Sequence, residues 1–180
     1  MPETPTRILF VCLGNIIRSP LGEKLFEHVA TEAGVGHKYQ VDSAGTSAYH
    51  IGERPDERMR RTAQRRGFVY DGSARQVKAS DLDDFDLVIA MDLENMNNLL
   101  RLARTEGQRV KVHLMRPIDP EADGAVAVPD PWYDGPQGFE NVYDIVDRSV
   151  RGLLRWLEAG ASSQRGRSYS APPSDASAPE

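Results

Sequence analysis

The sequence predicts an α/β fold of three layers (α/β/α), with helices on both faces of a four-stranded parallel sheet. Four short apolar runs alternate along the chain with segments of helical periodicity, which is the pattern of such folds. The first and third runs are continuous, as in strands that are buried on both faces. With 180 residues, of which 39% are hydrophobic, the chain has enough apolar material for one core.

The first part of the chain begins with a strand over residues 7–11 and a loop over residues 12–17. A helix follows, with Ser19 as its N-cap and Pro20 at its first helical position. Gly34 ends this helix. Its apolar residues recur at every fourth position and so form one face: Leu21, Leu25, Val29 and Ala33.

The remaining elements alternate in the same way. We expect strands at 39–43, 86–90 and 110–114, helices at 56–66, 92–104 and 139–157, and loops at 44–55 and 116–137. The arginines of the helix at 56–66 are expected to form mostly a solvated face: Arg58, Arg60, Arg61, Arg65 and Arg66. The last helix has the clearest pattern, with apolar residues on one face over about five turns: Phe139, Val142, Tyr143, Val146, Val150, Leu153, Leu154 and Leu157.

The composition divides the chain into one domain and two flexible ends. Residues 7–160 are expected to form the domain, residues 1–6 to fray, and residues 161–180 to be a disordered tail. The tail is dense in Ser, Ala and Pro, and its few large apolar side chains cannot offset the entropy lost on ordering.

Composition also excludes several classes of protein. The single cysteine, Cys12, rules out an intramolecular disulfide and a multi-cysteine zinc site. No apolar run approaches the ~20 residues that span a bilayer, and the N-terminus lacks the features of a secretory signal. A net charge of −5 argues against general nucleic-acid binding. We therefore expect a cytoplasmic, soluble protein that binds neither membranes nor nucleic acid.

The loop after the first strand combines a nucleophile with the features of a phosphate-binding site. It runs from Cys12 through Gly14 and Asn15 to Arg18 and Ser19. A loop that leads into a helix N-terminus directs backbone N–H groups and the positive end of the helix dipole at one point. Gly14 and Asn15 tolerate left-handed backbone, and the guanidinium of Arg18 can hold two phosphate oxygens. The same field stabilises a thiolate at Cys12, to whose sulfur the hydroxyl of Ser19 can donate.

Cleavage of a phosphate ester through a phosphocysteine also needs an acid for the leaving group. The loop at 128–133 offers Asp130, which lies between two prolines and is followed by two aromatic residues that could wall a pocket. Simpler interpretations stay open at this point. A cysteine at a strand end is commonly a small buried hydrophobic residue, and Asp-Pro alone is a turn signal.

These motifs resemble those of the low-molecular-weight protein tyrosine phosphatase family, from residue 7 to about residue 157. The resemblance rests on the segments 12–20, 42–46, 74–76, 91–92, 130–133 and 139–144. It implies a phosphatase-I-like Rossmannoid fold and hydrolysis of phosphotyrosine and small aryl phosphates. It also implies that no metal or cofactor is needed, because the loop amides and Arg18 neutralise the phosphate charge.

The resemblance implies a role for each residue of the site. Cys12 attacks phosphorus, Arg18 binds the phosphoryl oxygens, and Asp130 protonates the leaving phenolate and then activates water. Ser43 and Asp92 support the loop and Arg18. Substrate binding falls to the loop and to the walls of the cleft, namely Leu13, Gly14, Asn15, Ile16, Ile17, Ser19, Tyr49, Trp132 and Tyr133. A slot with these walls would admit a phosphotyrosine of a protein substrate but not a short phosphoserine, and we expect a monomer or a weak dimer.

Two positions depart from the family's pattern. The family commonly has a second cysteine directly before the arginine, where this chain has Ile17, so that an oxidised Cys12 has no internal resolving thiol. Many members have a histidine two residues before the segment 74–76, hydrogen-bonded to the loop asparagine, where this chain has Gly72. We therefore expect the loop to lack one of its supports.

Other functions share parts of this pattern. Arsenate reductases have the same fold but relay electrons through further cysteines, which this chain lacks. Protein-arginine phosphatases tend to have threonine at the position of Ile16, and the isoleucine favours phosphotyrosine. A non-catalytic phosphate-binding module would need neither the nucleophile Cys12 nor the acid Asp130. The four histidines show no metal-ligand spacing and are interpreted as incidental: His28, His37, His50 and His113.

Overall fold

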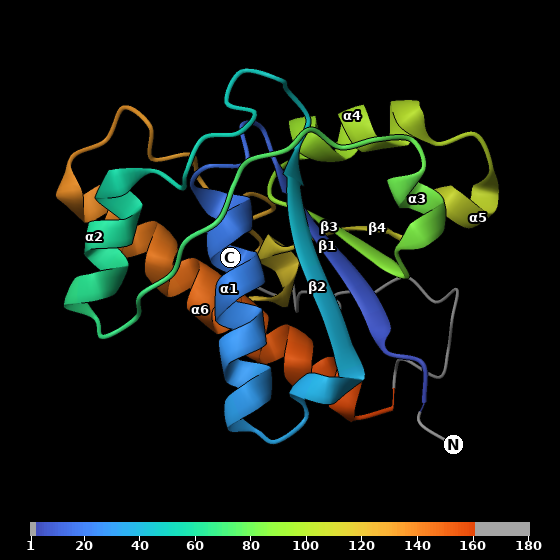
Figure 1. The fold of residues 1–180 in the computed structure, drawn as a ribbon, viewed down its shortest axis with the longest axis horizontal. Helices are drawn as coiled ribbons and strands as arrows, with labels where there is room; N and C mark the ends of the chain where they lie inside the picture. The colour runs from blue at the N-terminus through green and yellow to red at the C-terminus, as the bar shows by residue number, and fades with distance from the viewer. Residues whose placement is uncertain (1–2, 161–180) are drawn as a thin grey trace, which may run out of the picture.

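The computed structural model describes residues 3–160, and its centre is a parallel sheet with helices on both faces (Figure 1). The strand order is β2-β1-β3-β4. The strands are β1 (Thr6–Cys12), β2 (Tyr39–Gly45), β3 (Leu87–Ala90) and β4 (Val112–Leu114). This architecture confirms the predicted three-layer α/β fold with four parallel strands.

The side chains of β1 fill two cores, one on each face of the sheet. Ile8 and Phe10 belong to the core beneath α1 and α6, whereas Leu9 and Val11 belong to the core beneath α3 and α4. All four side chains are fully buried. The continuous apolar run at the start of the sequence therefore forms a central strand that is covered on both sides.

The described residues also form six α-helices and two short 3₁₀ turns, of which the last turn and the last helix follow β4. They are α1 (Arg18–Glu32), η1 (Gly36–Lys38), α2 (Glu57–Arg65), α3 (Asp81–Asp84), α4 (Leu93–Leu102), α5 (Glu106–Arg109), η2 (Arg116–Ile118) and α6 (Pro136–Glu158). The predicted apolar face of α6 is confirmed, because all eight of its residues are buried. The sequence analysis missed α3, α5 and both 3₁₀ turns, since elements of four residues or fewer show no periodicity.

The start of α1 differs from the prediction. The helix begins at Arg18, and Ile17 occupies the cap position without a side-chain hydrogen bond. The predicted N-cap, Ser19, instead directs its hydroxyl at Cys12 and Asn15. An uncapped N-terminus leaves backbone N–H groups free for an anion, and so the prediction of an ordinary cap was wrong for a physical reason.

The other boundaries shift by a few residues, as is usual for element ends. Thr6, which was expected in the flexible N-terminus, pairs with Tyr39 in the sheet. Asp92 and Asp56, which were expected inside helices, are the N-caps of α4 and α2. The predicted tail at 161–180 lies outside the described residues, and among residues 3–160 no helix has the length and apolar character to cross a membrane.

The parallel register brings the carboxyl ends of the strands together at one edge of the sheet. Cys12 pairs with Gly45, and Val11 pairs with Ala90. The loops that follow β1, β2 and β3 therefore meet at the upper edge of the sheet in Figure 1. Ligand sites of open α/β folds lie at this edge.

Candidate active site

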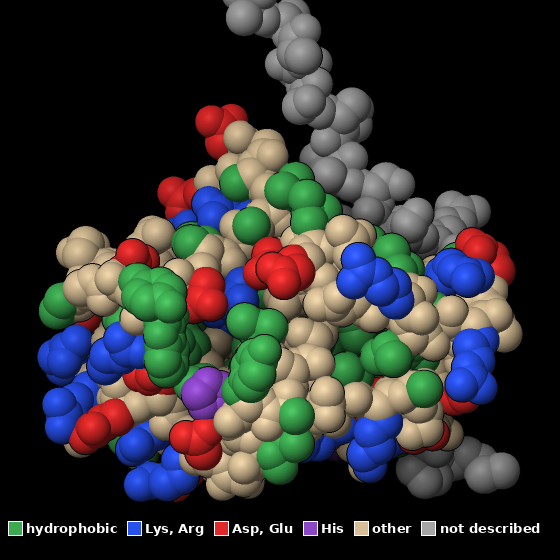
Figure 2. Space-filling model, turned by 90° about the horizontal axis from the view of Figure 1, so that it is seen from above, with side chains coloured by type: hydrophobic (Ala, Val, Ile, Leu, Met, Phe, Trp, Pro, Cys, Tyr) green, Lys and Arg blue, Asp and Glu red, His purple; other side chains and the backbone are tan. Residues whose placement is uncertain are grey.

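A cavity of about 400 Å³ opens at this edge of the sheet. It brings together residues from the loop after β1, from the loop after β2 and from the loop before α6, namely Cys12, Leu13, Gly14, Ile16, Ile17, Arg18, Tyr49, His50, Asp130, Trp132 and Tyr133. Viewed from above, this face of the molecule carries hydrophobic side chains on both sides of a histidine (Figure 2). The sequence analysis named ten of these residues and set His50 aside as incidental.

The sulfur of Cys12 lies at the bottom of the loop that follows β1. Cys12 is the last residue of that strand and is buried. Its sulfur accepts a hydrogen bond from the backbone N–H of Asn15 at 3.3 Å, and it lies 3.0 Å from the hydroxyl oxygen of Ser19. Both contacts favour negative charge on the sulfur when the hydroxyl donates, because a thiolate is the better acceptor.

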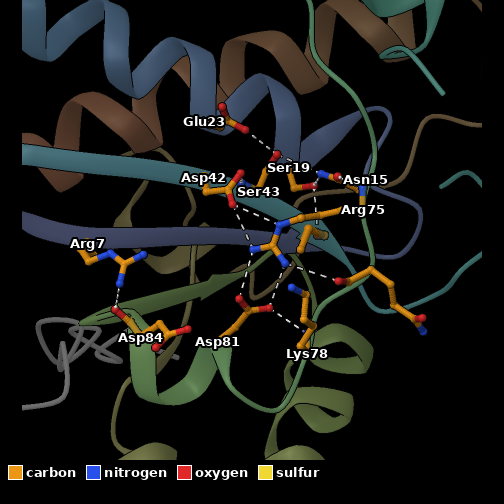
Figure 3. Close-up of polar contacts among 12 residues, drawn as sticks. Arg7, Asn15, Ser19, Glu23, Asp42, Ser43, Arg75, Lys78, Asp81 and Asp84 are labelled. Carbon is orange, nitrogen blue, oxygen red and sulfur yellow. Dashed lines mark hydrogen bonds and ion pairs between the residues drawn. The ribbon is translucent and has the colours of Figure 1, made fainter. Parts of the chain in front are cut away.

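Asn15 holds the loop in its conformation from the inside. Its backbone has φ = +56°, a left-handed conformation that asparagine tolerates better than most residues. Its side-chain NH₂ donates to the hydroxyl oxygens of Ser19 at 2.8 Å and Ser43 at 2.9 Å, and its carbonyl oxygen accepts from the backbone N–H of Arg75 at 3.0 Å (Figure 3). Every polar group of this buried side chain therefore has a partner.

This result corrects the expectation that the loop lacks a support because Gly72 replaces a histidine. Both donors of Asn15 and its acceptor are used without any contact from Gly72. The hydroxyl of Ser43 in turn donates to the carboxylate of Glu23 at 2.6 Å, and Glu23 forms an ion pair with Lys24 at 2.9 Å. Sequence reasoning missed Glu23, which follows the loop on α1 and has no motif of its own.

The end of β2 packs tightly against residues 12–18, which are called the nucleophile loop below because the sequence predicts a nucleophile there. A Cβ atom at Gly45 would lie 2.7 Å from the carbonyl oxygen of Leu13, so that only glycine fits there. Immediately afterwards, Thr46 and Ser47 donate backbone hydrogen bonds to the carbonyl oxygens of Cys12 and Leu13, each at 2.9 Å. Because these bonds occupy the carbonyl oxygens, they fix the outer side of the loop.

The buried side chain of Arg18 lines the cavity, and residues outside the loop fix its guanidinium. One nitrogen, Nη1, donates to the carboxylate of Asp92 at 2.7 Å and to the carbonyl oxygen of Val128 at 3.0 Å. Burial acts to lower the pKa of Arg18, but the interactions with Cys12 and with the carboxylate of Asp92 raise it above its ordinary value. Asp92 also caps α4 by accepting from the backbone N–H of Asn95 at 2.8 Å, which fixes the carboxylate.

Asp130 faces Arg18 from the opposite wall. Its Oδ2 atom lies 3.7 Å from Nη2 of Arg18, and its Oδ1 atom accepts from the backbone N–H of Trp132 at 3.1 Å. The side chain of Asp130 is 42% exposed and lines the cavity. The thiol of Cys12 and the guanidinium of Arg18, which are close in sequence, thus share one cavity with the carboxyl group of the distant Asp130.

Fold and site together define a parallel α/β protein with a buried cysteine at the end of β1, directly before the loop that leads into the N-terminus of α1. Residues 7–163 match the family described as "Low molecular weight phosphotyrosine protein phosphatase". The chain belongs to this family. No cluster of three or more side chains with metal-ligand chemistry occurs in the part of the chain that the structure describes.

Relatives from several kingdoms match most of the chain. A "Low molecular weight protein-tyrosine-phosphatase" of Streptomyces coelicolor is 43% identical over 149 residues, covering 82% of this chain and 91% of the relative. A crystal structure of a protein tyrosine phosphatase from Entamoeba histolytica, with Hepes in its active site, is 38% identical and has a TM-score of 0.82, covering 87% of this chain and 99% of that one. A Drosophila arginine phosphatase is 28% identical with a TM-score of 0.76, covering 84% and 97%.

Proposed function

We propose that this protein hydrolyses phosphotyrosine in proteins, and small aryl phosphates, through a phosphocysteine intermediate. The observation that carries the proposal is the meeting of Cys12, Arg18 and Asp130 in one cavity, with the carboxylate 3.7 Å from the guanidinium. Binding of phosphate alone would need neither a nucleophile nor an acid at these positions. The names of the relatives support the same substrate class.

In the first step, the thiolate of Cys12 attacks phosphorus and forms an S–P bond. The bond between phosphorus and the phenolic oxygen breaks, and that oxygen takes the proton of the Asp130 carboxyl group. Arg18 and the loop amides hold the three equatorial oxygens, over which the charge of the transition state is spread. Because Asp92 and Val128 fix the guanidinium before substrate binds, little reorganisation is needed.

In the second step, water attacks phosphorus on the side that the phenol has left. The carboxylate of Asp130 takes a proton from that water, the S–P bond breaks, and inorganic phosphate is released. The hydrogen bonds from Asn15 and Ser19 stabilise the thiolate of Cys12 as the leaving group.

The shape of the cavity favours an aryl substrate. Its rim carries Tyr49, Trp132 and Tyr133, between which a phenyl ring can reach the buried sulfur. Ile16, which also lines the cavity, offers no hydroxyl to a phosphoguanidinium group. The proposal includes a cytoplasmic location, where a thiol nucleophile stays reduced, and a monomer or weak dimer.

The test is hydrolysis of p-nitrophenyl phosphate by the purified protein. We expect C12S to abolish activity and D130A to lower kcat by about 10²–10⁴-fold, the usual contribution of a general acid. D134A is the matched control, since Asp134 is an exposed acid of the same loop.

Peptides with phosphotyrosine, phosphoserine and phosphoarginine then define the substrate. Equal rates on phosphoserine, or a preference for phosphoarginine, would contradict the proposed specificity, and retained activity in C12S would contradict the mechanism.

A further inference from the structure

One arginine of α2 differs from its neighbours on that helix. The α2 arginines are mostly exposed, as predicted, and several form surface ion pairs, such as Arg61 with Glu57 one turn earlier. The guanidinium of Arg58, however, lies over the rings of Trp132 and Phe139, with its central carbon 5.0 and 4.7 Å from the ring centroids. Arg58 is therefore fixed between α2, α6 and the loop that carries Asp130.

On one side, Arg58 is connected to the nucleophile loop through Asp56. The carboxylate of Asp56 receives two hydrogen bonds from the guanidinium, from Nε at 3.1 Å and from Nη2 at 2.9 Å. The backbone N–H of Asp56 donates to the carbonyl oxygen of Ile16 at 2.7 Å. Since Ile16 lies inside the loop between Cys12 and Arg18, the position of Asp56 is tied to that loop.

On the other side, Arg58 is connected to the acid. Its third nitrogen, Nη1, donates to the carbonyl oxygen of Trp132 at 2.9 Å. The N–H of the same residue, Trp132, donates to Oδ1 of Asp130 at 3.1 Å. An unbroken set of hydrogen bonds thus runs from Ile16 through Asp56, Arg58 and Trp132 to the carboxyl group of Asp130.

We propose that Arg58 is a positioning residue, which sets the distance of the Asp130 carboxyl group from the nucleophile loop. The inference rests on the proposed function, because it assigns Arg58 a part in the same reaction. All the groups of its planar fork are engaged, two on Asp56 and one on Trp132, and its face covers two rings. A lysine has neither the fork nor the flat face, so it cannot make both connections at once.

The partial exposure of Asp130 explains why such a connection matters. A carboxyl group on an exposed loop samples several positions, and a misplacement of about 1 Å can cost up to about 10²-fold in rate. Removing Arg58 leaves the nucleophile, Arg18 and the acid chemically intact. The expected defect is therefore confined to the steps in which Asp130 transfers a proton.

The experiment compares kcat/KM for two substrates with R58L. With phenyl phosphate, whose leaving group needs a proton, we expect a loss of about 10–100-fold. With 2,4-dinitrophenyl phosphate, whose leaving group departs as a stable anion, we expect a loss of less than about 3-fold. D130A should also lose more kcat/KM on phenyl phosphate than on 2,4-dinitrophenyl phosphate, and its loss on phenyl phosphate should exceed that of R58L. R61L is the matched control and should equal the wild type on both.

The conservative variant R58K separates positioning from charge. The kcat/KM of R58K for phenyl phosphate should be nearly as low as that of R58L. If circular dichroism shows that R58L is unfolded, R58K takes its place in the comparison of substrates. Three results would overturn the inference and leave the proposed function intact. They are an equal loss for R58L on both substrates, a loss for R58L no larger than that for R61L, and full activity of R58K on phenyl phosphate. A wild-type protein that hydrolyses neither substrate would overturn both.

Discussion

The two loops that meet in the cavity are built in different ways. In the nucleophile loop, Cys12, Asn15 and Arg18 are each only 3% exposed, and their polar groups are bonded to several elements of the domain. In the loop at 128–133, called the acid loop here, Trp132 is 39% and Tyr133 is 96% exposed. Besides a turn of its own backbone, this loop is held at Val128 by Arg18 and Met91, and at Trp132 by Arg58 and His50.

The difference fits the function proposed above for each loop. A phosphate dianion is stabilised best by donors that are already in place, so a loop with the proposed role gains from a rigid buried network. In the same proposal a bulky substrate enters past the acid loop, and an exposed loop leaves the entrance open. Variants of the first loop should therefore lower both stability and activity, whereas variants of the second should change activity alone.

Asn15 is the position where the largest combined effect is expected. N15A removes three hydrogen bonds, leaves Ser19, Ser43 and the N–H of Arg75 without that partner, and keeps a strained left-handed backbone. We expect the free energy of unfolding to fall by about 3 kcal/mol, at about 1 kcal/mol for each bond, and kcat to fall on the order of 10²-fold. Urea denaturation and p-nitrophenyl phosphate hydrolysis measure the two effects.

The matched variant N15G separates backbone strain from the lost hydrogen bonds. Glycine adopts φ = +56° without strain, and so N15G should be more stable than N15A by about 1 kcal/mol. Its activity should stay as low as that of N15A, because the amide is missing in both. A variant N15A with wild-type stability would contradict the description of this loop as a rigid network.

Tyr133 tests the opposite expectation for the acid loop. Because its side chain is almost fully exposed, Y133A should change the free energy of unfolding by less than about 0.5 kcal/mol. Its kcat/KM for a phosphotyrosine peptide should fall by about 3- to 10-fold, the value of one aromatic contact at the rim. Hydrolysis of acetyl phosphate, which has no aromatic ring to contact the rim, is the internal control. A clear loss of stability would show that the two loops are more alike than their exposure suggests.

The sequence allowed much of the nucleophile loop to be predicted, because its chemistry is local. Strand, loop and helix N-terminus follow one another directly, and Cys12, Asn15 and Arg18 lie within seven positions. The sheet was predictable for a similar reason, since a strand buried on both faces is a continuous apolar run. The exact start of α1 was not, because Ile17 occupies the cap position and the hydroxyl of Ser19 contacts Cys12 and Asn15 instead, an arrangement that has no local signal in the sequence.

The contacts between the loops could not be predicted, because they join residues far apart in the sequence. Glu23 supports the nucleophile loop only through Ser43 on β2, whereas the backbone N–H of Arg75 contacts Asn15 directly. Arg58 has the same local surroundings in sequence as the other arginines of its helix, and only the fold places Trp132 and Phe139 beneath it. His50 reaches the cavity because the loop after β2 folds back over Gly14.

A last prediction concerns stability at a position remote from both loops. His113 is buried in β4 beside a cavity of only about 10 Å³, and burial lowers its pKa below the ordinary 6.5. The folded protein therefore keeps this imidazole neutral at a pH where the unfolded chain already protonates it. Stability from this group is complete above pH 6.5 and is lost as the pH falls below that value, with a slope of at most about 1.4 kcal/mol per pH unit for one proton.

H113L removes this titration while keeping an apolar side chain among apolar neighbours. The difference in unfolding free energy between the wild type and H113L should change between pH 7 and pH 5, in favour of H113L at the lower pH, as measured by urea denaturation. Activity on p-nitrophenyl phosphate at pH 7 should stay within about 2-fold of the wild type, because His113 contacts neither loop. A constant difference across this pH range would contradict the pKa shift. A large loss of activity in a folded H113L would show that catalysis depends on β4 as well. The contrast between the two loops would then not explain which variants lose activity.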